Sequence, residues 1–387
     1  MQSLPSSTDN LFDKDWPDFR SFWNLAPTIA HLNHGSFGAV PRKLKKAQNS
    51  WQTRLERNPN GFIWSELEPA MELVRRRVST FLNTSPNQLL LTSNITNAIS
   101  TVLASTTLLP GDEILITEDT YPGVKAAVAQ AALRFQACVV VVDLPSHNLT
   151  PLGISSAILE HVSPHTRLAI IDHITSPTAI LLDVTLLTKE LHQKGVKVAI
   201  DGAHATGSIP VDINSIGADF YVGNFHKWCC SPHSSACLAF SQNSNSLLPG
   251  IPGLKDNEGF PQRFEWAGTL DYSAILATPD ALSFFDKIGW QRTREQNTTL
   301  VAYGARIVSE FFEQIAPAES QLPMQVVSIP SPFKNLGSLN LRNALAKQGV
   351  EVAVVDARNQ LFLRLSAHLY NRPSDYQKLV KALKKLK

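Results

Sequence analysis

The stretch 168–203, LAIIDHITSPTAILLDVTLLTKELHQKGVKVAIDGA, decides the fold. It contains an apolar run at 168–172, a segment with helical periodicity at 184–194 and a second apolar run at 196–200. A strand, a helix and a strand in this order form the unit from which parallel sheets are built. The stretch therefore predicts a mostly parallel sheet with helices on both faces.

The same alternation extends through the first two-thirds of the chain. Further strands are expected at 88–92, 111–117, 138–143, 220–223 and 235–240, and further helices at 63–81, 97–109 and 123–135. After a long loop at 247–271, a helix is expected at 291–315, and strands near 324–329, 350–355 and 361–365. A last helix follows Pro373, with Ser374 and Gln377 as its capping box. This α+β tail predicts a second, smaller domain.

Composition excludes several classes of protein. With 387 residues, 43% of them hydrophobic, the chain can bury a large core, and its formal net charge of +2 gives no reason to expect a nucleic-acid partner. Four cysteines do not make a disulfide framework and fit a reducing compartment. We expect no signal peptide, and no apolar run is long enough to cross a bilayer. These features predict a cytoplasmic protein without a membrane partner.

Two residues just beyond the ends of predicted strands carry the chemistry. Asp201 follows the run VKVAI, and Lys227 lies in VGNFHKW (222–228), between a histidine and a tryptophan. Ligands of open α/β sheets bind beyond the carboxyl ends of the strands. Taken alone, Asp201 could equally be a helix cap, and Lys227 a surface lysine. Together, a carboxylate and an amine are what pyridoxal 5′-phosphate (PLP) needs, because the first keeps its pyridine nitrogen protonated and the second forms a Schiff base with its aldehyde.

A phosphate site is expected in SNITNAIS (93–100), which joins a predicted strand to the start of a helix. Free backbone N–H groups at such a junction bind anions. The sequence has neither GxGxxG nor GxxxxGK[ST], so a dinucleotide or P-loop site lacks support. Zinc is a rival hypothesis because His226, Cys229, Cys230 and His233 are close in sequence, but adjacent cysteines rarely both bind one tetrahedral metal. We therefore expect PLP and no metal.

At these residues the sequence resembles the class V aminotransferase family of fold-type I PLP enzymes, especially isopenicillin N epimerase-like proteins and cysteine C–S lyases. The resemblance extends from about Leu32 to Asn371. Its markers are LNHGSFG (32–38), RNPNGFIWSEL (57–67), EDTYPGVK (118–125), DGAHATG (201–207), NFHKW (224–228), EWAGTLDYS (265–273) and RLSAHLYN (364–371). It implies an α/β fold with two domains. The large domain, 26–270, would hold a mostly parallel seven-stranded sheet between helices, and the small α+β domain would comprise 1–25 and 271–387.

The resemblance also implies a role for each matching residue. Lys227 would carry the Schiff base, Asp201 would pair with the pyridine nitrogen and His204 would lie near the phenolic oxygen of PLP. Tyr121 would stack on the cofactor ring. The residues expected at the phosphate are Ile95 and Asn97 through their backbone, together with Thr96, Asn224 and His226. Thr269 would reach the phosphate of a neighbouring subunit, which implies a homodimer with shared active sites.

Arg364 is the residue expected to bind the substrate. In LFLRL (361–365) it alternates with leucines, so an exposed arginine on a half-buried strand is one interpretation. The resemblance implies the other, a planar guanidinium that binds the α-carboxylate of an amino acid with two hydrogen bonds. The complete expected substrate-binding set is Arg364, His34 and Ser176.

Departures from the family pattern bear on the reaction. Cysteine desulfurases carry a nucleophilic cysteine shortly before the carboxylate-binding arginine, whereas no cysteine follows Cys237 here. Ile95, Asn97 and Leu270 also differ from common family residues. The resemblance implies an external aldimine with an amino acid and removal of its α-proton by Lys227. We predict an epimerase resembling isopenicillin N epimerase. The alternatives are a C–S β-lyase, then an aminotransferase, and outside enzymes a binding protein that has lost catalysis.

Overall fold

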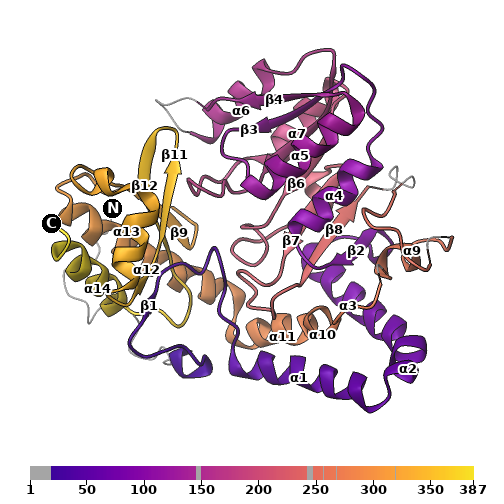
Figure 1. Cartoon of the computed structure of the whole chain (residues 1–387), viewed down its shortest axis with the longest axis horizontal. Helices are drawn as coiled ribbons and strands as arrows, with labels where there is room; N and C mark the ends of the chain where they lie inside the picture. The colour runs from indigo at the N-terminus through magenta and orange to yellow at the C-terminus, as the bar shows by residue number, and fades with distance from the viewer. Residues whose placement is uncertain (1–18, 145–149, 242–246, 256, 267, 319) are drawn as a thin grey trace. The chain divides into compact units, whose positions relative to one another are not determined.

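The structure, a computed structural model, describes residues 19–144, 150–241, 247–255, 257–266, 268–318 and 320–387 (Figure 1). The chain divides into two compact units. We call residues 44–176 and 180–283 the sheet unit, and residues 1–43, 177–179 and 284–387 the tail unit. The domain limits drawn from the sequence, at residues 25 and 270, stay a prediction.

The sheet unit is built on a seven-stranded sheet with the order β2-β8-β7-β6-β5-β3-β4. Its strands are β2 (Leu89–Thr92), β3 (Glu113–Thr117), β4 (Cys138–Val142), β5 (Thr166–Asp172), β6 (Lys197–Asp201), β7 (Phe220–Asn224) and β8 (Ala236–Phe240). Only β8 runs antiparallel to its neighbours, β2 and β7. The predicted mostly parallel seven-stranded sheet is therefore confirmed.

Helices surround this sheet, labelled in Figure 1. The sheet unit contains most of α1 (Arg42–Arg57), then α2 (Pro59–Gly61), α3 (Leu67–Leu82), α4 (Ile95–Ser105), α5 (Pro122–Phe135), α6 (Pro151–Glu160), α7 (Val184–Gln193), α8 (Ile213–Ile216), α9 (Gln262–Glu265), α10 (Ser273–Leu276) and the start of α11 (Thr278–Ile288). Apolar residues of α4 and α5 form one core with Ile170 of β5 and Ala199 of β6. Side chains alternate along a strand, so Asp172 and Asp201 lie on this same face.

The tail unit has an antiparallel sheet with the order β11-β12-β9. Its elements are β1 (Ala30–His31), α12 (Trp290–Phe311), β9 (Met324–Ser328), α13 (Gly337–Ala346), β10 (Val350–Glu351), β11 (Ala353–Ala357), β12 (Gln360–Ser366) and α14 (Pro373–Lys384). The single strand expected at 350–355 is wrong in one respect. The chain there forms two strands, because β10 pairs with β1 whereas β11 pairs with β12.

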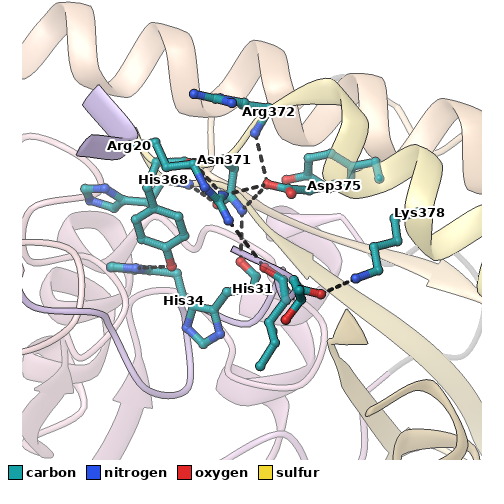
Figure 2. A network of polar contacts seen from close by, with 12 residues as sticks. Arg20, His31, His34, His368, Asn371, Arg372, Asp375 and Lys378 are labelled. Atoms are coloured by element: carbon teal, nitrogen blue, oxygen red, sulfur yellow. Dashed lines mark hydrogen bonds and ion pairs between the residues drawn. The ribbon is translucent and has the colours of Figure 1, made fainter. Parts of the chain in front are cut away.

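A polar network ties the first described residues of the tail unit to helix α14 (Figure 2). Arg20 donates to the carbonyl oxygen of Tyr370 at 3.1 Å and forms an ion pair with Asp375 at 3.5 Å. Asp375 also accepts the backbone N–H of Arg372 at 3.1 Å. The predicted capping box of Ser374 and Gln377 is therefore wrong. The N-cap is Arg372, two residues before the expected Ser374, so the helix begins at Pro373 and Asp375 is the third helical residue, whose carboxylate completes the capping box.

Candidate active site

Three neighbouring parallel strands place polar residues at one edge of the sheet. Strand β5 ends at Asp172, β6 at Asp201 and β7 at Asn224. Asp172 and Asp201 are register partners, and Asp201 is opposite Val222 in β7. The carboxyl ends of parallel strands thus bring together side chains that are far apart in sequence, at the edge where such sheets bind ligands.

Asp201 is a buried carboxylate with only 4% of its surface exposed. Its Oδ1 accepts the N–H of Ala203 at 2.9 Å. Burial raises the pKa of Asp201, and the hydrogen bond from Ala203 and the positive charge of Lys227 oppose that rise. The charge of Lys227 therefore acts on Asp201, so the structure places the two residues on which the cofactor hypothesis depends in the same region.

Lys227 lies in the turn that follows β7. Its Nζ is 3.2 Å from Nε2 of His204, a residue of the segment after β6 that is itself buried. The turn is held by hydrogen bonds from the N–H of Cys230 to the carbonyl of Lys227 and from the N–H of Phe225 to that of Ser235, both at 2.9 Å. An amine whose hydrogen-bond partner is an imidazole nitrogen can pass a proton to it, and this pair is suited to proton transfer.

The N-terminus of α4 is the candidate phosphate site. The side chain of Asn94 caps this helix by accepting a hydrogen bond from the backbone N–H of Asn97 at 2.9 Å. The N–H of Asn97, one of the predicted phosphate donors, is therefore already used. The side chain of Ile95 is packed in the core, which leaves only its backbone for a ligand. The N–H groups of a first helical turn have no partner inside the helix, and those of Ile95 and Thr96 are the ones that the cap does not use.

Tyr121 and Thr96 lie beside one another at this site. A Cβ atom on Gly123 would come within 2.7 Å of the Tyr121 ring and 3.3 Å of the Thr96 hydroxyl oxygen, so both side chains border the same glycine. Tyr121 precedes α5 and is 45% exposed. A largely apolar ring left this open beside a helix N-terminus offers a surface on which a flat ligand can stack.

Asn224 and His226 are the predicted phosphate ligands just before Lys227. Asn224 is buried, and its Oδ1 has no hydrogen-bond partner among the described residues. Burial lowers the pKa of His226 to about 4, and its Nδ1 lies 3.0 Å from the carbonyl oxygen of Ser235. A carbonyl only accepts, so Nδ1 carries the proton. Nε2 of neutral His226 is then an acceptor and would donate to a phosphate only after protonation.

Arg364 lies in β12 of the tail unit and is only 5% exposed. The interpretation of an exposed arginine is therefore wrong. Its Nη2 donates to Oγ of Ser36 at 2.6 Å and lies 3.5 Å from Oδ1 of Asn33. Burial lowers its pKa to about 10. A buried guanidinium is costly to desolvate, so its presence favours a role in binding an anion.

The remaining predicted residues are placed as follows. His34 is fully buried in the tail unit, with Nδ1 2.9 Å from the hydroxyl of Tyr370 (Figure 2) and its ring stacked on His368. Ser176 is half-buried in the segment after β5. Thr269 is exposed, and Ala267 of its AGT segment lies outside the described residues. The roles of these residues stay predictions.

Sequence reasoning missed Asp172 and the pair of His173 and Tyr221. His173 Nδ1 and the Tyr221 hydroxyl are 3.0 Å apart, and burial lowers the pKa of His173 to about 4. A usable signal for Asp172 was present. One expected strand ends at Asp172 and the next is directly followed by Asp201, and neighbouring parallel strands bring such ends together.

Comparisons with known proteins identify the family and the fold. The family model for class V aminotransferases matches residues 63–379. The chain is 29% identical to isopenicillin N epimerase of Amycolatopsis lactamdurans, over 96% of this chain and 98% of that protein. It is 30% identical to putative L-cysteine desulfhydrase 1 of Oryza sativa subsp. japonica, over 92% and 83%. A solved structure of the cystine C–S lyase C-DES has a TM-score of 0.81 at 21% identity, covering 92% of this chain and 97% of that one.

The chain belongs to the class V aminotransferase family. It is an enzyme with the fold-type I architecture, and its cofactor is PLP. The residues present fit that group. Asp201 supplies a buried carboxylate and Lys227 an amine, and Asn224 has a buried amide oxygen without a described partner. When bound, PLP acts as an electron sink for the bonds at the α-carbon of an amino acid. The described residues include no helix long and apolar enough to cross a membrane.

Gly202 supports the position of Asp201, and this gives a first prediction. A Cβ atom at this glycine would be 2.3 Å from Oη and 2.4 Å from Cζ of Tyr221, inside the fixed end of a buried ring. We expect Gly202→Ala to lower the free energy of unfolding by about 1–3 kcal/mol and to weaken PLP binding, because the adjacent Asp201 must shift.

Urea unfolding and PLP titration measure the two effects. Gly259→Ala is the matched control, because nothing lies within 4 Å of a Cβ atom built there. If both variants behave alike, the contact between Gly202 and Tyr221 does not position Asp201.

Proposed function

We propose that this enzyme is an amino-acid epimerase resembling isopenicillin N epimerase, in which Lys227 removes the α-proton of an amino acid. The observation that carries the proposal is the distance of 3.2 Å between Nζ of Lys227 and Nε2 of His204. Asp201 holds the pyridine nitrogen, and Arg364 binds the α-carboxylate and so orients the scissile bond. The first relatives, isopenicillin N epimerases of two organisms, support this choice of reaction.

Epimerisation needs a second acid that returns the proton to the opposite face of the substrate. The candidates for this acid are His34, Tyr121 and Cys229, and of these Cys229 fits least. Its Sγ is buried, 3.9 Å from the carbonyl oxygen of Thr206, and would meet a Cβ atom on Gly207 at 2.7 Å. His34 is also buried and has Tyr370 as a partner. Tyr121 is the exposed member of the set, and its hydroxyl is the group we assign to reprotonation.

The second candidate function is a C–S β-lyase that acts on cysteine or a cysteine conjugate. It is favoured by the curated relatives named L-cysteine desulfhydrase, in Oryza sativa and Arabidopsis thaliana. A lyase needs Lys227 but no second acid on the far face. An aminotransferase is the third candidate, because return of the proton to the cofactor would complete that reaction.

A panel assay with Tyr121→Phe decides between these reactions. Purified protein is incubated with L-amino acids and cysteine conjugates, and D-isomer, pyruvate, sulfide and keto acid are measured. For an epimerase we expect D-isomer, and in Tyr121→Phe an inversion rate about 10²-fold lower, because the ring remains but the hydroxyl is lost. Sulfide or pyruvate, produced equally by the variant, would select the lyase and contradict the epimerase.

We further propose that the enzyme is cytoplasmic and works as a homodimer with shared active sites. The exposed position of Thr269 supports the dimer, since a residue that reaches a neighbouring subunit must lie at the surface of its own chain. The absence of a disulfide framework among four cysteines supports the compartment.

A further inference from the structure

Asp172 is a second buried carboxyl group beside Asp201. The two residues are register partners at the ends of β5 and β6, and each is 4% exposed. Neighbouring strands lie about 4.8 Å apart, and paired residues of parallel strands point to the same face. The two carboxyl groups therefore lie side by side at the edge where the cofactor is proposed to bind.

The carboxyl group of Asp172 has a hydrogen-bond partner among the described residues for only one of its two oxygens. The hydroxyl of Thr120 donates a hydrogen bond to the carboxyl group. Oδ2 is buried and has no partner among the described residues. The charged groups that act on Asp172 are Asp201, Asp119 and Lys227. A buried oxygen left without a hydrogen bond is costly, and in a binding site it is typical of a group that a ligand completes.

Two adjacent buried carboxyl groups cannot both ionise without a large cost. Burial raises the pKa of Asp172 well above its usual range, and the negative charges of Asp201 and Asp119 raise it further. The hydrogen bond from Thr120 and the positive charge of Lys227 act in the opposite direction. Burial raises the pKa of Asp201 as well, but the hydrogen bond from the N–H of Ala203 and the positive charge of Lys227 oppose that rise. The protein without cofactor therefore holds one proton on the pair, and Asp172 carries it.

We propose that Asp172 is a positioning residue for the pyridine end of the cofactor, which holds a proton while the site is empty and releases it when a cationic ring nitrogen binds at Asp201. The proposal rests on the proposed function, because it takes Asp201 as the partner of the ring. With a cationic ring bound at Asp201, the second carboxylate would add negative charge at the same end of the site. The O–H bond of Asp172 breaks, the proton leaves to solvent, and the charge of the ring compensates that of the new carboxylate.

Asp172→Asn is expected to change stability and cofactor affinity in opposite directions. A carboxyl group with a raised pKa binds its proton more tightly in the folded protein than in the unfolded chain. The folded protein therefore loses stability as pH rises from about 4 through the folded-state pKa. An amide of the same shape stays neutral and can still accept from Thr120. Without cofactor, we expect the variant to melt about 3 °C or more above the unchanged protein at pH 8, with a flatter pH profile.

Cofactor binding should instead weaken in Asp172→Asn. A carboxylate next to a cationic group raises the pKa of that group by about one unit or more, which corresponds to a tenfold change in an equilibrium constant. We therefore expect PLP to bind about tenfold more weakly to the variant at pH 8. The unchanged protein should bind PLP more tightly as pH rises and release about one proton more per cofactor than the variant. A spectroscopic titration of PLP and a pH indicator in weakly buffered solution measure the two quantities.

Asp356→Asn is the matched control, because it makes the same chemical change at an exposed strand position. It should change neither the pH profile of melting nor the PLP titration. Asp172→Ser is a second neutral variant if the amide does not fold.

Two outcomes would overturn the proposal. Equal pH profiles of melting for Asp172→Asn and the unchanged protein would show that Asp172 is not the proton carrier. Loss of stability together with loss of affinity would show an ordinary structural residue. Failure of the unchanged protein to bind PLP would instead refute the proposed function and the cofactor part of this inference, while the melting profiles still test the protonation of Asp172.

Discussion

Replacing Lys227 with alanine is expected to abolish the absorbance of bound PLP above 400 nm, a wavelength that is roughly typical of a protonated Schiff base, and to lower the turnover of any amino-acid substrate at least about 10³-fold. The physical reason is that one amine serves two purposes. In the proposed reaction its nitrogen would form the bond to the cofactor aldehyde, and its lone pair would remove the α-proton. Its Nζ is 3.2 Å from Nε2 of His204.

Lys227→Arg is the matched variant for this prediction. An arginine keeps the positive charge that lowers the pKa of Asp201 but cannot form a Schiff base. We expect it to be as inactive as the alanine variant, although PLP should bind more tightly to it than to Lys227→Ala. Substantial turnover in either variant would mean that another group provides the base, and the assignment of Lys227 would be wrong.

Replacing Arg364 with methionine is expected to lower kcat/KM for amino-acid substrates about 10²-fold while leaving PLP binding unchanged. A bidentate hydrogen bond between a guanidinium and a carboxylate is among the stronger polar interactions, and its loss removes about 2–4 kcal/mol of substrate binding. The change should appear mainly in KM for the amino acid, because the α-carboxylate is bound in the ground state as well as in the transition state.

Stability separates a binding role of Arg364 from a structural one. Burial lowers its pKa to about 10, so the folded state binds protons less well than the unfolded state and the charge costs stability at neutral pH. Methionine has a similar length and no charge, and we expect Arg364→Met to unfold at the same urea concentration as the unchanged protein or a higher one.

Arg364→Lys is the control, since it keeps the charge but loses the planar fork. Its activity should lie between those of the methionine variant and the unchanged protein. If Arg364→Met instead unfolds more easily and loses PLP, the main task of Arg364 is to hold the loop of Asn33 and Ser36, with which it shares hydrogen bonds.

Local patterns predicted most of the secondary structure. The run at 196–200 became β6, Lys197–Asp201, and the helix expected at 291–315 became α12, Trp290–Phe311. These elements depend on the periodicity of apolar residues, which is visible in sequence. The errors concern where elements end and which strands pair with each other. The segment 350–355 divides because β10 and β11 pair with different strands, and no local pattern specifies a partner.

The candidate site shows the same division. Asp201 could be singled out because it directly follows an apolar run and Lys227 because it lies four residues after one, and the resemblance to the family gave them roles. Asp172 ends an equally clear strand, but its importance comes from being the register partner of Asp201. Arg364 was ambiguous because alternation with leucines does not say whether the second face of a strand is covered.

The sequence by itself determined the order of strands and helices along the chain, and the motifs by which it resembles a known family gave the class of enzyme and the proposed roles of Asp201 and Lys227. These are properties of short segments, set by hydrophobic periodicity and by residue type. Only the tertiary structure decided that Asp172 lies beside Asp201, that Arg364 is buried and that Tyr221 contacts Gly202. Burial and electrostatic coupling depend on neighbours that are distant along the chain, so the protonation of these groups is set by the folded protein.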